Sequence, residues 1–244
     1  MSTSKHPTGL RTLFFTEMWE RMSFYGMRGI LVLFMTASIS DGGLDFNNAS
    51  ASAIYGIYAA SVYLATLPGG WIGDNIFGQQ KTILYGGIII MFGHLALAIP
   101  SMNFFYLGLT LVVVGTGLLK PNISAIVGGL YDKNTSLRES GFTIFYMSIN
   151  LGSILGFFIC GFLGENIGWH YGFGAAGIGM LFGVLQYKVN IKSLGEIGLK
   201  PTSELEAQTK KKYLRVTIAL STISLIILVS GFLDFWRIDP IPLA

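Results

Sequence analysis

Long apolar segments recur along this chain and constrain its fold more than any other feature. A helix needs roughly 20 apolar residues to cross a bilayer. Segments near or above this length cover residues 12–38, 51–73, 82–100, 103–130, 141–164, 171–189 and 214–234. In lipid, each backbone polar group needs a partner within the chain, so such segments form helices. The sequence therefore predicts an all-α, polytopic membrane protein that lies in a lipid bilayer.

Composition agrees with a membrane protein. Hydrophobic residues make up 52% of the 244 positions and charged residues only 12%, against roughly a quarter in soluble domains. The 32 glycines are suited to helix packing in membranes, where small residues let backbones approach closely. A single cysteine, Cys160, excludes a disulfide framework within the chain. The net charge of +3 reflects loop lysines and arginines, so no nucleic-acid partner is expected.

Positive charges are distributed unevenly between the loops, and this predicts the orientation of the chain. Lysines and arginines are retained on the cytoplasmic side of a membrane. They occur in the N-terminus, in the turns near Lys81 and Lys133, and beyond residue 188, whereas the opposite loops carry acids such as Asp41 and Glu165. We therefore expect the N-terminus to be cytoplasmic.

The hydropathy and charge patterns divide the chain into five parts. A polar, lysine-rich stretch separates the first six apolar segments from the seventh and is expected to be a solvated linker. The predicted parts are a cytoplasmic N-terminus (1–11), a six-helix bundle (12–189), a cytoplasmic linker (190–213), an extra transmembrane helix (214–234) and a short, truncated end (235–244).

Charged side chains inside the first apolar segment are the strongest functional signal; they are Glu17, Glu20, Arg21 and Arg28. A charge at the bilayer centre costs roughly 2.5–3.5 kcal/mol, so such residues face a bundle interior or an aqueous path. On a helix the four fall within an arc of about 140°. Glu17 and Arg21 could simply neutralise one another, but buried ion pairs stabilise weakly. A carboxylate beside a movable cation can also exchange a proton, which favours Glu17 and Glu20 as proton carriers.

Two further segments place polar groups at membrane depth. Lys120 precedes Pro121, which removes a helical hydrogen bond and predicts a kink beside the charge; a lysine that snorkels from a helix end is the alternative. Asn150 precedes Gly152, the first of several small residues spaced four apart, a pattern typical of close helix contact. Alone, Asn150 would be a hydrogen-bonding contact between helices, but beside the other polar groups it is predicted to line a pocket.

Four separate motifs resemble the proton-dependent oligopeptide transporter family, a branch of the major facilitator superfamily. Residues 17–25 resemble its ExxERxxYY motif, with Phe24 in place of the first tyrosine. Residues 69–78, 120–122 and 142–152 are similar to its signatures in the second, fourth and fifth helices. The resemblance implies a six-helix N-terminal bundle of two three-helix repeats, normally paired with a C-terminal bundle. The seventh segment resembles the extra helix that bacterial members carry between the bundles.

The resemblance also implies roles for single residues. Glu17 and Glu20 would couple transport to protons, and Arg28 would bind the carboxylate of a peptide, which suits the forked guanidinium. The implied charge partners of the glutamates are Arg21 and Lys120. The implied pocket residues are Arg21, Tyr25, Tyr63, Lys120 and Asn150, and the implied gating or structural residues are Asp74, Pro121 and Gly152. Asp74 could equally be a plain turn residue, and His94 is expected to be packed between helices.

The sequence thus predicts the N-terminal half of a proton-coupled symporter that imports di- and tripeptides by alternating access, in a bacterial cytoplasmic membrane. Since the C-terminal bundle is missing, we expect no transport by this chain alone. A related transporter of another carboxylate-bearing or anionic solute, and a non-transporting half-bundle that associates with a partner, remain alternatives. The spacings of catalytic Ser, Cys and His or of metal ligands are missing, so neither an enzyme nor a metal is expected. Protons would be the coupling ion, with no other cofactor.

Overall fold

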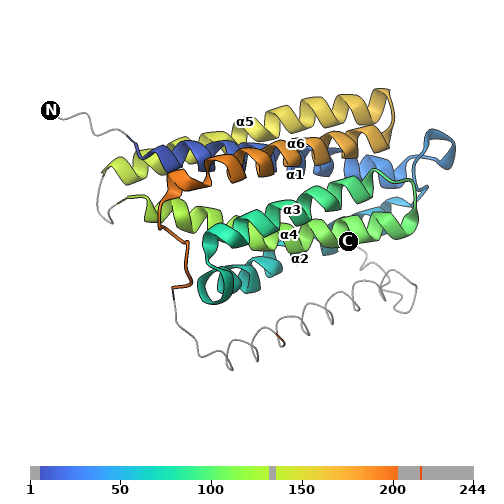
Figure 1. The fold of residues 1–244 in the computed structure, drawn as a ribbon. Helices are drawn as coiled ribbons and strands as arrows, with labels where there is room; N and C mark the ends of the chain where they lie inside the picture. The colour runs from blue at the N-terminus through green and yellow to red at the C-terminus, as the bar shows by residue number, and fades with distance from the viewer. Residues whose placement is uncertain (1–5, 132–135, 203–214, 216–244) are drawn as a thin grey trace, which may run out of the picture.

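The computed structural model describes residues 6–131, 136–202 and 215. This part of the chain folds into long helices (Figure 1): α1 (Thr8–Thr36), α2 (Asn48–Ile72), α3 (Gln79–Leu97), α4 (Met102–Gly129), α5 (Ser136–Asn166) and α6 (Trp169–Asn190). Short helical turns follow three of them, namely η1 (Ile39–Asp41), η2 (Gly73–Phe77) and η3 (Ile191–Leu194). The predicted seventh helix and the predicted end of the chain lie outside the described residues, apart from Arg215.

Each predicted segment between residues 12 and 189 corresponds to one helix, which confirms the all-α fold class. Within the described ranges, the stretches long and apolar enough to cross a membrane are Asn48–Phe77, Gln79–Leu97, Met102–Gly129 and Ser136–Asn166. The first of these joins α2 to η2. The helices α1 and α6 are also of membrane-spanning length, at 29 and 22 residues, but charged residues within α1 and polar residues near the ends of α6 lower their hydropathy.

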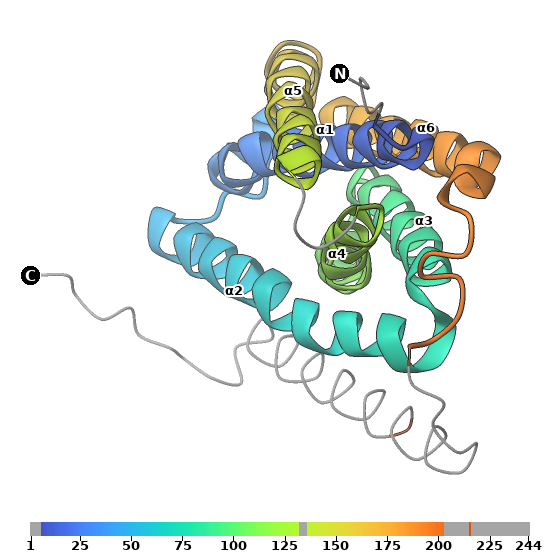
Figure 2. The ribbon, with the colours of Figure 1, turned by 90° about the vertical axis from the view of Figure 1, so that its left-hand side faces the viewer.

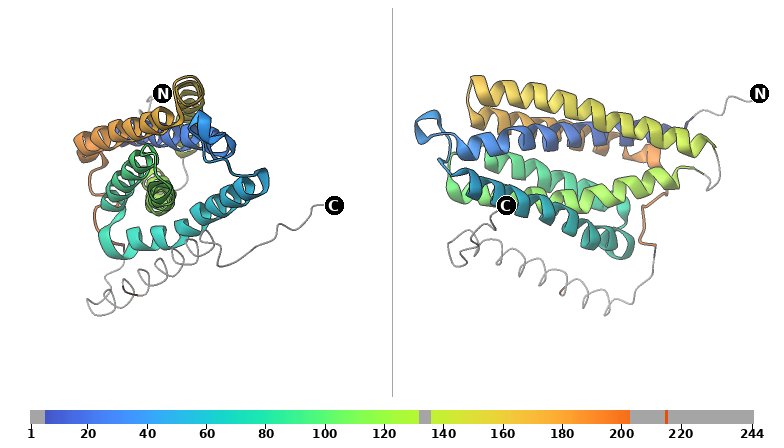
Figure 3. Two further views of the ribbon diagram at one scale, coloured as in Figure 1. Left: turned by 90° about the vertical axis from the view of Figure 1, so that its right-hand side faces the viewer. Right: turned by 180° about the vertical axis from the view of Figure 1, so that it is seen from behind.

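The helices form two layers, with α1, α5 and α6 in one and α2, α3 and α4 in the other (Figures 1 and 3). Helix α1 packs most extensively on α5 and α6, and α3 packs on α4 and α6. Helix α2 is supported mainly by α4 and contacts α1 only lightly. Seen along the helices, α2 therefore borders the bundle beneath α1 (Figure 2).

Small residues bring α5 against α1, as the four-residue spacing predicted. Gly152, Gly156, Cys160 and Gly164 are all buried. A side chain at Gly156 would collide with the backbone carbonyl of Met22 in α1. A side chain at Gly152 would collide with the Met18 carbonyl and would lie 2.8 Å from the Cβ of Arg21. The two backbones are thus in direct contact beside the charged residues of α1.

The crossing of α2 and α4 is centred on Pro121. Helix α4 continues through the proline, which has no N–H to donate to the carbonyl of Gly117. That carbonyl lies against Gly69 of α2, where any side chain would collide with it. Asn122 Nδ2 donates to the carbonyl oxygen of Gly69 at 3.0 Å and also to that of Leu118 in its own helix at 2.7 Å. This buried amide therefore ties α2 to α4.

The segment after α6, residues 191–202, packs against the ends of the helices, and we call it the strap (Figure 2). Gln80 Nε2 donates to the carbonyl oxygens of Gly195 and Ile197, both at 2.9 Å. The backbone N–H of Thr202 donates to the Asp74 carbonyl at 2.8 Å. The first part of the predicted linker is therefore folded onto the bundle rather than simply solvated.

Candidate functional site

The three charged residues of the central α1 turn form a buried cluster. Glu20 is fully buried, and Glu17 and Arg21 are each only 2% exposed. Arg21 Nε donates to Glu17 Oε1 at 2.7 Å and lies 2.8 Å from Glu20 Oε2. The charges therefore face the bundle interior, because an orientation toward lipid would leave them uncompensated.

The two carboxylates are not equally well satisfied. Arg21 Nε carries one hydrogen, and Glu17 accepts it. Neither oxygen of Glu20 accepts a hydrogen bond from any described residue, and Glu17 Oε2 and Arg21 Nη2 also lack partners there. A buried polar group without a partner is destabilising by roughly 1–3 kcal/mol, and by more when charged. The cluster therefore has capacity for a further partner, which a purely structural ion pair would not need.

Arg28 lies two turns further along α1 and is half-buried. Its Nε donates to the hydroxyl of Tyr55 in α2, and its guanidinium carbon lies 5.1 Å from the centre of the Tyr55 ring. No hydrogen bond from its Nη groups is found within the described part of the chain. Tyr55 thus holds the guanidinium while the outer part of the fork stays available to a ligand. The sequence interpretation missed Tyr55, although its position in the tyrosine-rich second segment offered a signal.

Lys120 and Tyr63, both predicted from the sequence, come together across the α2–α4 interface. Lys120 Nζ lies 4.9 Å from the centre of the Tyr63 ring, a cation–π contact. Lys120 is half-buried, and its charge also acts on Glu20. Tyr63 is 64% exposed. This pair therefore lies at the edge of the cluster rather than in the packed core.

Of the other predicted pocket residues, Asn150 lies apart from the charged cluster, whereas Tyr25 is close enough to interact electrostatically with Arg21. Asn150 is exposed on α5, on the face opposite Gly152. The Tyr25 ring packs on Phe24 and on Phe157, with centroids 5.5 and 6.2 Å away. Phe24 itself lies 5.5 Å below the Arg21 guanidinium, so the aromatic wall of the motif is kept despite the missing hydroxyl. The described residues alone do not bring Asn150 to the site.

The predicted gating residue Asp74 lies in η2, the turn between α2 and α3. Its Oδ1 accepts a hydrogen bond from Gln79 Nε2 at 2.8 Å, and its carbonyl accepts one from Thr202 in the strap. His94 in α3 is fully buried, as predicted, and neither ring nitrogen has a hydrogen-bond partner among the residues described. Neither side chain joins the charged cluster.

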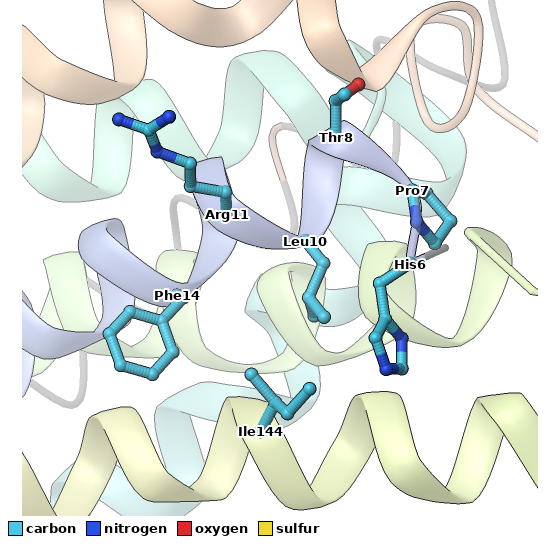
Figure 4. Close-up of a pocket in the computed structure, with 7 residues that line it drawn as sticks. All are labelled: His6, Pro7, Thr8, Leu10, Arg11, Phe14 and Ile144. Atoms are coloured by element: carbon cyan, nitrogen blue, oxygen red, sulfur yellow. The ribbon is translucent and has the colours of Figure 1, made fainter. Parts of the chain in front are cut away.

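A separate pocket of about 380 Å³ lies at the N-terminal end of α1, beside α5 (Figure 4). Its lining is His6, Pro7, Thr8, Leu10, Arg11, Phe14 and Ile144. His6 Nδ1 lies 2.9 Å from the Tyr131 hydroxyl, and burial raises the pKa of that hydroxyl. The pocket contains none of the predicted site residues, so we place the candidate site at the charges of α1 and α4 and the α2 tyrosines that contact them. The described residues hold no group of three His, Cys, Asp or Glu side chains suited to a metal.

Membrane-length helices around buried charges define a polytopic membrane protein with a polar interior, the architecture of a solute transporter. The model of the POT family matches residues 80–228, which is more than half of the chain. The chain therefore belongs to the POT family, and the resemblance seen in its four motifs is confirmed.

Known members of this family extend the comparison. The chain is 43% identical to a di-/tripeptide transporter of Lactococcus lactis subsp. cremoris, over 96% of this chain and 47% of that protein. Solved structures of a peptide transporter POT with sulfate and of a POT family transporter with 5-aminolevulinic acid both give a TM-score of 0.87. Their identities are 42% and 36%; they cover 97% and 98% of this chain, and 48% and 50% of their own chains. The chain thus spans about half the length of the relatives it matches.

Proposed function

We propose that this chain forms the carboxylate-binding and proton-coupling half of a transporter that imports di- and tripeptides together with protons by alternating access. One observation carries the proposal. A buried, incompletely satisfied Glu17–Arg21–Glu20 cluster lies on the same helix as Arg28, whose outer nitrogens make no hydrogen bond to any residue that the structure describes. Membership of the POT family, and the names of the relatives, support peptides as the substrate class.

Arg28 is the proposed contact for the peptide's C-terminal carboxylate. A guanidinium presents a planar fork that matches a carboxylate with two parallel hydrogen bonds. Tyr55 stacks on this group and accepts its Nε–H, so the fork is oriented before a ligand arrives. Tyr25, Tyr63 and Asn150 remain predicted pocket residues. Exposure of Tyr63 and Asn150 leaves both available to a peptide.

Glu20 is the proposed proton carrier. Glu17 already accepts the Nε–H of Arg21, whereas Glu20 accepts no hydrogen bond within the described ranges. Protonation converts the Glu20 carboxylate to a neutral acid and leaves Arg21 paired with Glu17 alone. Lys120, whose charge acts on Glu20, then loses an attracting partner. The two protonation states therefore favour different side-chain arrangements, which is how a proton biases a conformational equilibrium.

Transport also requires a second bundle, which we propose as the partner of the exposed faces of α2 and α5. Large apolar side chains are exposed on both helices, including Leu64 and Leu67 on α2 and Ile154 and Phe158 on α5. In this arrangement the site lies between the two bundles. The proposed membrane is the cytoplasmic membrane of a bacterium, with the N-terminus in the cytoplasm.

Uptake of a labelled dipeptide into proteoliposomes under an inward proton gradient tests the proposal. One sample holds this chain, and a second holds this chain joined to the part of the Lactococcus lactis transporter that it does not match. We expect uptake only by the joined protein, and we expect Glu20→Gln and Arg28→Ala to abolish it. Arg11→Ala, which removes an exposed arginine from the same helix, is the matched control and should transport normally.

A second candidate substrate is a carboxylate-bearing solute that is not a peptide. A solved POT family structure in complex with 5-aminolevulinic acid favours this candidate. The same proteoliposomes distinguish the two, because uptake of 5-aminolevulinic acid without uptake of any dipeptide would refute the peptide assignment. Dipeptide uptake that is unaffected by the proton gradient would refute proton coupling.

A further inference from the structure

Tyr58 of α2 has a buried hydroxyl that the proposed function does not explain. The residue is 2% exposed, and its hydroxyl has no hydrogen-bond partner among the residues that the structure describes. A buried tyrosine normally satisfies its O–H. Tyr187, for comparison, is equally buried and donates to the Gln80 carbonyl at 3.0 Å. The unpaired hydroxyl of Tyr58 therefore needs an explanation.

Tyr58 lies between the two functional parts of α1. It follows Tyr55, the partner of Arg28, by three residues on α2, so the two tyrosines share one side of that helix. It packs in the same apolar cluster as Phe24 and Met27, which follow Glu20 at four and seven residues and share its face of α1. The charges of both Glu20 and Arg28 act on its hydroxyl.

The unpaired hydrogen-bonding groups of Tyr58 and Glu20 are complementary. The phenol has a hydrogen to donate and no acceptor, and the carboxylate can accept hydrogen bonds and has no donor within the described chain. A phenol O–H donated to a carboxylate is charge-assisted and roughly twice as strong as a neutral hydrogen bond. Because α2 contacts α1 only lightly, a small approach of the two helices meets little packed resistance.

We propose that Tyr58 is a positioning residue that links ligand binding at Arg28 to the proton on Glu20. When Glu20 is ionised, the Tyr58 hydroxyl donates to it and holds α2 against α1. When Glu20 is protonated, this bond loses its charge assistance and α2 is released. A carboxylate that binds the outer nitrogens of Arg28 shifts the guanidinium together with Tyr55. Tyr58 lies one turn further along the same side of α2 and shifts with it. This inference rests on the proposed function.

The surroundings of Glu20 show which other groups take part. Glu17 and Arg21 act on it from its own helix, and Lys120 acts on it from α4. From α5, the closest approach to this turn is the backbone at Gly152. From α6, it is the backbone at Gly179 and Gly183, and α3 contacts α1 only lightly. On α2, as far as the structure describes it, Tyr58 is therefore the uncharged side chain that can form or lose a hydrogen bond when Glu20 changes its protonation state.

Tyr58→Phe tests the inference, because it removes the hydroxyl and keeps the ring. The transporter joined as above, in nanodiscs, is titrated with a labelled dipeptide across a range of pH. The unmodified protein should change its affinity at least about fivefold across the range, a typical coupling between linked sites, and Tyr58→Phe should remove most of this change. At low pH, where Glu20 is protonated, the variant should melt at the same temperature as the unmodified protein. At high pH it lacks the hydrogen bond to ionised Glu20 and should melt at a lower temperature. Full pH dependence in Tyr58→Phe would overturn the inference.

Tyr187→Phe is the matched control. It removes the hydroxyl of another buried tyrosine and breaks a hydrogen bond, so it should lower the melting temperature without changing the pH dependence of binding. Infrared difference spectroscopy supplies an independent readout, in which the carboxylic acid band lost in Glu20→Gln belongs to Glu20. Tyr58→Phe should alter this band even without peptide, and an unaltered band would contradict the inference. If no variant binds peptide but the Glu20 band responds to Tyr58→Phe, the proposed substrate fails and the link between Tyr58 and Glu20 stands.

Discussion

The two sides of α1 are held by opposite kinds of contact. Toward α5, glycines bring the backbones together, and a side chain at Gly152 or Gly156 would collide with α1. Toward α2, contact is sparse and includes polar side chains such as Arg28 and Tyr55. Several polar atoms on this second side have no partner within the described residues.

The two sides of α1 therefore have different roles: one contact stabilises the fold and the other can rearrange. Close-packed backbones have one good arrangement, because any displacement forfeits many contacts at once. Polar side chains across a loose interface have several, since a proton or a ligand can change which pairs form. The α1–α5 contact is therefore suited to a fixed scaffold, and the α1–α2 contact to a response. The following predictions test that division, from the largest expected effect to the smallest.

Replacing Gly156 by leucine should disrupt the close α1–α5 contact. The new side chain has no room beside the Met22 carbonyl and the backbone of Gly26, and overpacking costs about 1–3 kcal/mol or more. We expect little monodisperse protein and a strongly lowered melting temperature. Gly161→Leu is the control, because a Cβ there meets no atom within 4 Å. Equal stability of the two variants would show that the α1–α5 contact is not the fixed element.

Replacing Arg28 by alanine should weaken ligand binding on the α2 side of α1 without unfolding the protein. Hydrogen bonds to charged groups contribute about 1.5–3 kcal/mol, so dipeptide affinity should fall roughly tenfold to a hundredfold. Arg28→Lys keeps the charge without the fork and should recover only part of the affinity. Equilibrium binding and thermal melting, measured on the same samples, separate the two effects. A large loss of melting temperature in Arg28→Ala would instead assign Arg28 a structural role.

Replacing Gln80 by alanine should loosen the strap without affecting the charged cluster. Two carbonyl oxygens, those of Gly195 and Ile197, would lose their donor. We expect destabilisation of about 1–3 kcal/mol, seen as a lower melting temperature, with unchanged dipeptide affinity. Asn190→Ala, which removes an exposed side chain that bonds only within α6, should leave stability nearly unaltered. Loss of peptide binding in Gln80→Ala would show that the strap also shapes the site.

Replacing Tyr55 by phenylalanine should have the smallest effect. The variant loses the hydrogen bond to Arg28 but keeps the ring under the guanidinium, a contact that contributes about 0.5–1 kcal/mol. We expect a less than tenfold loss of dipeptide affinity and little change in melting temperature. A loss as large as that of Arg28→Ala would mean that Tyr55 contacts the peptide itself.

Sequence reasoning predicted the features that follow from local spacing. The six helices appear because apolar segments of membrane length have one stable backbone solution in lipid. The Glu17–Arg21 pair forms because residues four apart on a helix are neighbours. The buried series from Gly152 to Gly164 on α5 follows from the same periodicity.

Several features that depend on contacts between helices were not predicted. Competition between Glu17 and Glu20 for one hydrogen of Arg21 depends on side-chain geometry that spacing does not define. The Arg28–Tyr55 pair joins two helices whose crossing point no motif reveals. Polar composition after residue 190 indicated a solvated linker, but its backbone carbonyls, which carry no sequence signal, bind Gln80 and form the strap.

The close approach at Gly152 also determines how water and ligands can reach the charges. The α5 backbone lies so near Arg21 that no water fits between them, and α6 closes the next side through Gly179 and Gly183. Glu20 has no exposed surface in this arrangement. In the proposed function, the proton and the peptide carboxylate therefore approach the charges from the side of α2 and α4. Because the proton and the peptide would share one access route, the binding of either can block or assist access of the other. The packing of α5 and α6 on α1 would therefore influence the order in which they bind.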